Sequence, residues 1–221
     1  MKTKRKSNKH PVRWIAAIAA VALVFALCYT AINAQAREAV LNRIETIITA
    51  MFPAKDISIS IEGETEVLPH EPGGQAPSTE AGGAPAVPGF VIYYDTERYV
   101  MTEEDGVTYI RFELDADLPP CEMEIRHLGS IQPAAAAEAA RAEMLTTWPT
   151  VSEISPVDTP EGLHFSVTNG MNWDSAWENM YFVSDGQSGT YRIISRYFVE
   201  AAEGHGARFA AMLQTFEIIQ P

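Results

Sequence analysis

The feature that most constrains this chain is an uninterrupted apolar run over residues 14–34. At 1.5 Å per helical residue, its 21 residues cover about 30 Å, the thickness of the hydrocarbon layer of a membrane. The 13 residues before the run carry six Lys and Arg side chains and no acidic one. The positive-inside rule then keeps residues 1–13 in the cytoplasm. The sequence predicts a single-pass helix in the cell membrane, with the C-terminal part of the chain outside.

A cleaved secretory signal is the alternative, because Ala34, Gln35 and Ala36 form an A-x-A-like site after a basic segment. The apolar run exceeds the roughly 7 to 15 residues usual for the apolar part of a signal peptide. We therefore expect an anchored protein, with secretion after signal cleavage as the second interpretation. Both interpretations export the C-terminal part of the chain.

Charge separates the basic head from the rest of the chain. Ten of the 16 Lys and Arg residues and all 29 Asp and Glu residues follow residue 13, so that part carries a net charge of −19. Such a charge repels nucleic-acid phosphates and anionic lipid head groups and favours cationic partners. The charge excludes a nucleic-acid-binding protein.

The two cysteines indicate that disulfides do not stabilise the fold. Cys28 lies inside the apolar run and Cys121 lies in the exported part, so they cannot pair with each other. We expect Cys121 to be a buried apolar side chain, with an intermolecular link as the alternative.

Residues 35–62 predict an amphipathic stalk helix followed by a short strand. Apolar residues recur at helical spacing from Val40 to Met51, and Pro53 ends the helix. The apolar stripe needs a partner, which is the distal domain, the lipid interface or a second copy of the chain in a parallel dimer. The strand follows from the alternation of Ile and Ser over 57–61.

The next segment, 63–89, contains five Pro and six Gly among its 27 residues. This composition is typical of a disordered linker. The remaining residues, 90–221, match the commonest size of a single domain. The predicted organisation is therefore a basic head (1–13), a membrane helix (14–34), a stalk and strand (35–62), a linker (63–89) and one extracytoplasmic domain (90–221).

The distal domain combines strands with two helices. Period-two alternation predicts strands over 90–94, 99–103, 107–113, 121–127, 163–168, 177–184 and 191–198. Turn residues at 104–106 and 185–189 predict two hairpins, and helical spacing predicts helices over 133–147 and 203–216. We expect an α+β fold, a mostly antiparallel twisted sheet flanked by helices.

This layout resembles that of a PsbP-like domain. The likeness rests on the segment 89–95, the strand pair over 177–198 and the closing segment 203–217. It implies a PsbP-like sandwich and a scaffold that binds partners, without a common reaction and without site residues to carry over. The chain is also similar to short membrane-anchored proteins of Gram-positive bacteria.

Four residues are candidates for ligand binding. Trp173 and Trp177 lie in a polar, Gly-containing loop and predict an aromatic platform for a sugar or a peptide; the alternative is that they pack at the sheet edge. His205 and Arg208 lie at a predicted helix N-terminus, where backbone amides can hold an anion; the alternative is that they only begin the helix.

Acidic pairs raise the question of a metal site. Glu122 and Glu124 share one face of a predicted strand, and Asp115 and Asp117 precede it. Carboxylates so placed can bind a hard cation, but the simpler interpretation is that they face water while Cys121 and its alternate neighbours face the core. We therefore predict no metal, no cofactor and no catalytic residue.

These observations favour a membrane-anchored extracytoplasmic binding or interaction module. Its expected partner is an extracytoplasmic protein or an envelope ligand, with the membrane contacted through the N-terminal helix. Two alternatives stay open: an enzyme that acts on envelope material, and a structural or sensory subunit that forms a homodimer through its membrane helix and stalk.

Overall fold

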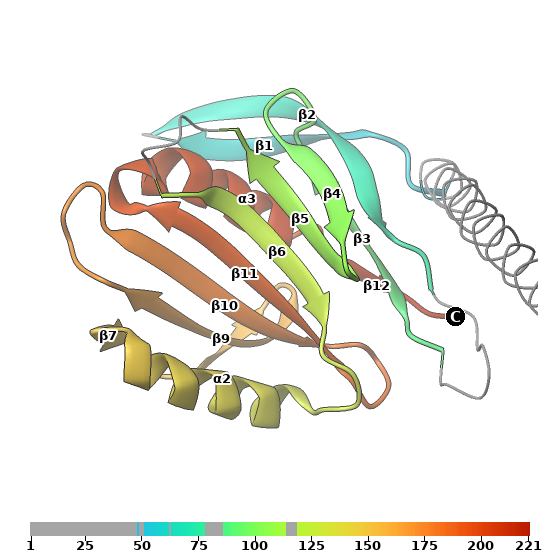
Figure 1. The fold of residues 1–221 in the computed structure, drawn as a ribbon. Coiled ribbons are helices and arrows are strands. Elements are labelled where there is room, and N and C mark those ends of the chain that lie inside the picture. Colours follow the sequence, from blue (N-terminus) through green and yellow to red (C-terminus); the bar gives the residue numbers. More distant parts are fainter. Residues whose placement is uncertain (1–47, 49–50, 62, 78–85, 114–118) are drawn as a thin grey trace, which may run out of the picture. The chain divides into compact units, whose positions relative to one another are not determined.

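In a computed structural model of the protein, the described residues are 48, 51–61, 63–77, 86–113 and 119–221. They form two antiparallel β-sheets with α-helices packed between and beside them (Figure 1). The strands are β1 (Lys55–Ile61), β2 (Glu64–Gln75), β3 (Gly89–Tyr94), β4 (Val100–Glu104), β5 (Val107–Phe112), β6 (Cys121–His127), β7 (Thr150–Val151), β8 (Ser155–Asp158), β9 (Glu161–Thr168), β10 (Ala176–Ser184), β11 (Thr190–Phe198) and β12 (Glu217–Ile219). The helical segments are α2 (Pro133–Thr147), the 3-10 turn η1 (Val199–Ala201), the π-helical turn η2 (Ala202–Gly206) and α3 (Ala207–Leu213).

The large sheet has the strand order β4-β5-β6-β11-β10-β9-β7, and β8 pairs with the outer edge of β9. Its longest pairing joins β10 to β11 from Ala176–Phe198 to Ser184–Thr190. Tight turns make this order possible. In the β4–β5 turn, Asp105 and Gly106 have φ angles of 51° and 74°, as the favoured two-residue hairpin turn requires.

One face of the large sheet is covered by α2. The buried Ala136 and Ala137 of the helix pack against Phe165, Phe182 and Ile194 of β9, β10 and β11. These alanines let the helix approach the sheet closely, because their side chains are short. The helix contacts β9, β10 and β11 and leaves the β4–β5–β6 part of this face to other side chains.

The opposite face packs against α3 and the small sheet, whose strand order is β1-β2-β3-β12. Phe90 and Ile92 of β3 share a core with Phe209 and Met212 of α3 and with Ile193 of β11. Figure 1 shows α2 and α3 on opposite sides of the large sheet. The described residues therefore form three layers, with the large sheet in the middle.

The predicted α+β class, a PsbP-like sandwich behind a helical stalk, is wrong, because the described residues form a β-rich fold. All pairings are antiparallel in both sheets, and β1 and β2 add a hairpin before the predicted domain. The strand predicted over 57–61 lies within β1, whereas β2 was not predicted because its glycines and prolines are typical of a linker.

The predicted disordered linker over 63–89 is wrong for the residues that form β2. This strand pairs with β1 on one side and with β3 on the other. Gly74 has a φ of 153°, and a Cβ built there would lie 2.0 Å from the carbonyl oxygen of Phe90. Gly74 thus permits the close approach of β2 to β3. From composition alone, the glycines of this segment predict disorder instead. Residues 78–85 lie outside the described residues.

In the part of the chain that the structure describes, no helix is long and apolar enough to cross a membrane. This finding corrects the prediction of a transmembrane protein. The predicted span itself, 14–34, and most of the predicted stalk lie outside the described residues. Of the stalk, Phe52 donates its backbone N–H to Ile48 at 2.8 Å just before Pro53. Localisation and homodimer formation stay predictions.

Other predictions for the distal domain are confirmed. The seven predicted strands correspond to β3, β4, β5, β6, β9, β10 and β11, and the helix over 133–147 is α2. The helix predicted over 203–216 is shorter, because η2 occupies its first turn and α3 ends at Leu213. Cys121 is a free cysteine with 1% of its surface exposed.

Substituting Gly74 by Ala tests whether β2 is a strand. We expect Gly74→Ala to lower the free energy of unfolding by at least about 2 kcal/mol, because the new Cβ meets the β3 backbone. The matched control is Gly63→Ala, at a φ of 83° with no atom within 4 Å of the added Cβ; we expect it to cost about 1 kcal/mol. Urea denaturation measures both, and equal small effects would show that the segment is a linker.

Candidate functional site

The structure places His205 and Arg208 in internal contacts, and their predicted role in binding an anion stays a prediction. The hydroxyl of Tyr99 lies 2.8 Å from Nδ1 of His205. Arg208, 7% exposed, donates from Nη2 to Glu66 of β2 at 2.8 Å. Burial lowers the pKa of His205, and Arg208 lowers it further. His205 thus connects η2 to the residue before β4, and Arg208 connects α3 to β2.

The two predicted tryptophans have different roles. Trp173 is 58% exposed in the β9–β10 loop, and its carbonyl accepts the backbone N–H of Glu200 at 2.9 Å. Trp177 lies on β10, half-buried, and its indole donates to Oδ1 of Asn179 at 3.3 Å. Of the four predicted residues, only Trp177 belongs to a polar cluster.

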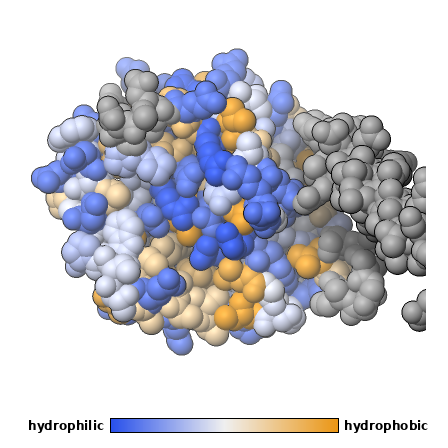
Figure 2. Space-filling model, viewed as in Figure 1, coloured by the Kyte–Doolittle hydropathy of each residue, from blue (hydrophilic) through white to orange (hydrophobic). Residues whose placement is uncertain are grey.

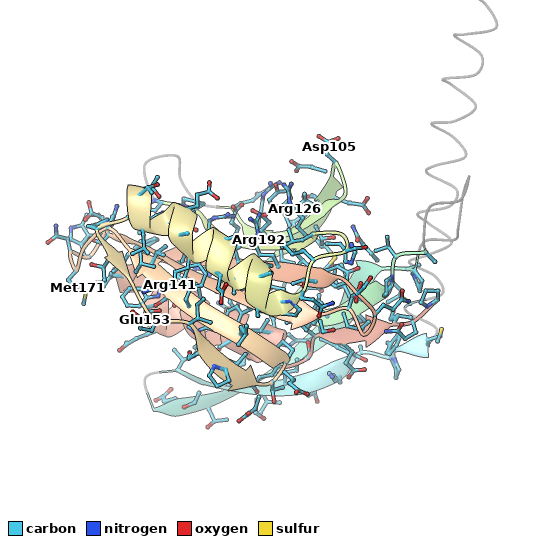
Figure 3. All side chains as sticks on the ribbon, turned by 90° about the horizontal axis from the view of Figure 1, so that it is seen from below. Asp105, Arg126, Arg141, Glu153, Met171 and Arg192 are labelled. Atoms are coloured by element: carbon cyan, nitrogen blue, oxygen red, sulfur yellow. The ribbon has the colours of Figure 1, made fainter. Side chains whose placement is uncertain are left out.

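A network of arginines and glutamates occupies the part of the α2-side sheet face that the helix leaves open. Ile194 packs against α2 and alternates along β11 with Arg192 and Arg196, which places both arginines on the same side as the helix. Figure 2 shows hydrophilic residues gathered on this face, and Figure 3 shows Arg126 and Arg192 near each other beside α2. The members of the arginine–glutamate network are Glu104, Arg111, Glu122, Glu124, Arg126, Glu178, Arg192 and Arg196.

Glu124 is the most buried acid of the network. Its carboxylate accepts hydrogen bonds from Arg192 at 2.7 Å and from Arg196 at 2.9 Å. Burial raises the pKa of Glu124, but the two arginines together lower it by more, so that the pKa lies below its ordinary value. The expectation that Glu122 and Glu124 face open water is wrong, whereas Cys121 faces the core as predicted.

A second cluster lies on the other face of the sheet, on the side away from α2. Trp177, Asn179 and Tyr181 alternate along β10 with residues that α2 covers, and their partners on β9 include Ser166 and His164. Tyr197 of β11 lies opposite Trp177. All of these side chains are half-buried. We call them the aromatic track: His164, Ser166, Trp177, Asn179, Tyr181 and Tyr197.

Hydrogen bonds fix the orientation of the aromatic track. The indole of Trp177 can only donate, so the Asn179 atom that it meets is the oxygen. The same oxygen lies 3.2 Å from Nε2 of His164, which therefore carries the proton and donates, leaving Nδ1 as an acceptor. The Asn179 amide donates to the hydroxyl of Tyr197 at 2.8 Å, so the Tyr197 proton is available for another acceptor.

The aromatic track is uncharged at neutral pH. Burial lowers the pKa of His164, and the hydrogen bond to Asn179 opposes this only in part. Burial raises the pKa of Tyr181 to about 12, with a further contribution from Tyr197, whose own pKa burial also raises. The rings of His164 and Tyr181 lie 4.6 Å apart, measured between centroids. The track thus combines aromatic surface with one free acceptor and one free donor.

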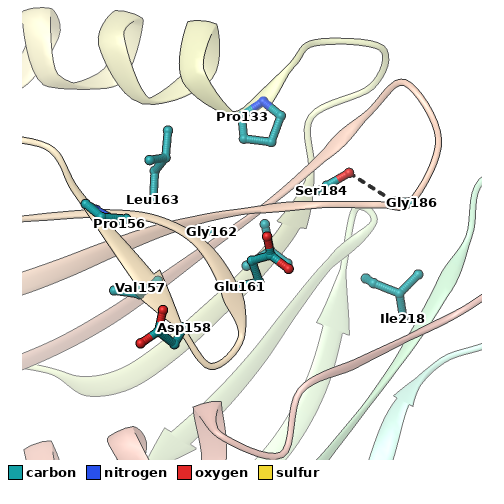
Figure 4. A pocket seen from close by; sticks show the side chains of 11 residues that line it. Pro133, Pro156, Val157, Asp158, Glu161, Gly162, Leu163, Ser184, Gly186 and Ile218 are labelled. Atoms are coloured by element: carbon teal, nitrogen blue, oxygen red, sulfur yellow. Dashed lines mark hydrogen bonds between the residues drawn. The ribbon is translucent and has the colours of Figure 1, made fainter.

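A pocket of about 610 Å³ continues the track at one end. Gly162 and Val183, which face each other across β9 and β10, line it next to the His164–Tyr181 pair. Figure 4 shows Asp158 and Glu161 at the β8–β9 turn, with Ile218 of β12 across the pocket. We call it the end pocket; its lining residues are Pro133, Pro156, Val157, Asp158, Glu161, Gly162, Leu163, Val183, Ser184, Gly186 and Ile218.

The end pocket and the aromatic track form one line along β10. From Val183 to Trp177 the strand advances six residues, or about 20 Å at 3.3 Å per residue. At the far end, a Cβ built on Gly206 of η2 would lie 3.1 Å from the ring of Tyr197, so the helical turn borders the track there. This length suits an extended chain of about six residues.

His127 and Asp185 are hydrogen-bonded as in a catalytic His–Asp pair, but their hydrogen bonds stabilise the β10–β11 hairpin turn. Nε2 of His127 lies 3.0 Å from Oδ2 of Asp185, and Nδ1 accepts the N–H of Gly129 at 3.3 Å. The other carboxylate oxygen accepts the N–H groups of Gln187 and Gly189. Both ring nitrogens of His127 are therefore engaged in holding the β10–β11 turn.

Within the described part of the chain, no group of three or more His, Cys, Asp and Glu side chains is arranged to hold a metal ion. Asp115 and Asp117, named above as metal candidates, lie outside it. No protein-family model matches this chain, and none of the curated proteins does. The likeness to PsbP-like domains stays a prediction.

Glu124→Gln tests the arginine–glutamate network. We expect a loss of about 3 kcal/mol in the free energy of unfolding at pH 7, because Arg192 and Arg196 lose their shared charge partner. Because the folded pKa of Glu124 lies below the unfolded one, this stabilisation is present above about pH 5 and is lost as the pH falls through the folded pKa. Chemical denaturation at several pH values measures the difference from the wild type.

The control is Glu104→Gln, whose side chain is 55% exposed at the edge of the same network. We expect little change in stability from this variant. Equal losses of unfolding free energy in the two variants would contradict a central role for Glu124. So would a stability difference between Glu124→Gln and the wild type that grows on acidification.

Proposed function

We propose that this protein is a binding module that holds an extended polypeptide segment along the aromatic track. The observation that carries the proposal is the row of half-buried, uncharged side chains on β9, β10 and β11, placed on the sheet face away from α2. Tyr181 and Tyr197 pack in part against the core that α3 and the small sheet cover. The half-buried surface that the track residues present carries no charged side chain, unlike the arginine–glutamate network on the other face.

The residue types of the aromatic track favour protein recognition. Tyr and Trp supply large contact areas with few rotatable bonds, and Asn and Ser supply adaptable hydrogen bonds, as in antibody paratopes. Trp and Tyr also carry much of the binding energy at protein interfaces. The track contains one Trp, two Tyr, one Asn and one Ser within three neighbouring strands.

The free hydrogen-bonding atoms match a peptide backbone. Nδ1 of His164 accepts and the hydroxyl of Tyr197 donates, which complements an N–H and a C=O of an extended chain. A glycan would also meet aromatic rings and polar atoms, but the carboxylates at the end pocket favour a ligand that carries positive charge, as polypeptides do. We therefore propose a peptide rather than a glycan as the ligand. Export of the domain, as residues 1–36 predict, would put the partner outside the cytoplasm.

Peptide selection tests the proposal. The full chain is panned against a phage library of random ten-residue peptides, and the enriched peptides are synthesised and titrated by calorimetry. We expect Trp177→Ala and Tyr181→Ala each to weaken binding by at least about tenfold, because each removes an aromatic contact. Tyr109→Ala is the matched control, since Tyr109 is half-buried and lies on the opposite face, over Arg111.

Two further measurements keep the result interpretable. Thermal denaturation shows whether a variant is folded, and amide chemical-shift changes in the wild-type protein show where the peptide binds. Shifts centred on β9 and β10 support the proposal. Binding that Tyr109→Ala weakens as much as Tyr181→Ala does, or enriched ligands on a glycan array with none in the peptide library, would overturn it.

A further inference from the structure

The end pocket combines an apolar lining with two carboxylates. Pro156, Val157 and Leu163 of β8 and β9 and Ile218 of β12 contribute apolar surface. Asp158 and Glu161 are exposed at the turn that joins β8 to β9. Among the described residues that line the pocket, none is basic. A ligand group that is apolar along its length and positively charged at its tip would complement this lining.

The two carboxylates of the end pocket face each other. Asp158 and Glu161 are direct partners in the β8–β9 register, and like charges at such positions repel each other. Neither side chain forms an ion pair with another described residue. A bound cation would remove this repulsion, whereas a neutral or anionic ligand would leave it in place.

The protein has no basic side chain of its own to offer in the described region. All eight Lys and Arg side chains there are already engaged: Lys55 lies 3.7 Å from the centre of the Tyr93 ring, and seven arginines, Arg98, Arg111, Arg126, Arg141, Arg192, Arg196 and Arg208, form ion pairs. The same region carries 23 acidic residues. Within the described region, no Lys or Arg side chain complements Asp158 and Glu161, which leaves these carboxylates open to a cationic ligand.

We infer that the end pocket takes a Lys or Arg side chain of the bound peptide. The methylene stem would lie on Val157, which pairs with Gly162, and the cationic head would reach around the β8–β9 turn to Asp158 and Glu161. Because Gly162 and Val183 of the pocket lie on the same sheet face as the neighbouring pair His164 and Tyr181, the next residues of the same peptide would lie over that pair. This inference rests on the proposed function and adds the chemical class of one ligand residue.

The test uses the tightest-binding peptide from the library described above. Each Lys is replaced by norleucine and each Arg by citrulline, which remove the charge and keep the stem. We expect one such replacement to weaken binding to the wild-type chain by about tenfold. With Asp158→Asn/Glu161→Gln, the same replacement should change binding by less than about twofold.

A matched charge control separates the pocket from the overall field. Glu138→Gln/Glu143→Gln removes two exposed carboxylates from α2 and should retain the preference for the charged peptide. Selected peptides without a basic residue, or a preference for charge that Asp158→Asn/Glu161→Gln retains, would overturn the inference. If such neutral peptides still lose affinity in Tyr181→Ala, the proposed function holds and the pocket assignment alone fails; no peptide sensitive to Tyr181→Ala means that the proposed function itself fails.

Discussion

The antiparallel register of β10 with β11 is the constraint on which the rest of the structure depends. Along these strands, alternation sends Met180 and Arg196 to the side of α2 and sends Asn179 and Tyr197 to the other side. A slip of one residue would exchange the two faces, placing charged side chains in the core and apolar ones in water. The core, the arginine–glutamate network and the aromatic track are therefore specified together by one strand pairing.

Charge is distributed in a way that the composition does not reveal. The basic side chains of the described region are engaged with partners inside the domain, half of them in the arginine–glutamate network. The network needs its arginines because Glu124 is buried, and a buried carboxylate is costly without a cation. The surface that remains is acidic, so long-range attraction for a partner depends on positive charge in that partner and weakens with salt.

Local patterns predicted the strands of the distal domain well, since alternation along one strand needs no knowledge of its neighbours. They failed at β2, whose glycines and prolines look like a linker, although Gly74 serves the contact with β3. They also did not bring together the residues of the candidate site. His164 and Asn179 are 15 residues apart and Glu124 and Arg196 are 72 apart, so only the sheet register brings each pair together. Of the aromatic track, only Trp177 was named as a candidate, because it follows a polar, Gly-containing segment, although it lies on β10.

The buried thiol of Cys121 has a consequence for how the domain behaves in an oxidising environment. Burial raises the pKa of Cys121 to about 11, so the thiol stays protonated and unreactive at neutral pH. It lies in β6, between β5 and β11, where a reagent can reach it only when these strands separate. A disulfide between two folded copies through Cys121 is therefore excluded. The rate at which an alkylating reagent modifies this thiol instead reports how often the middle of the sheet opens.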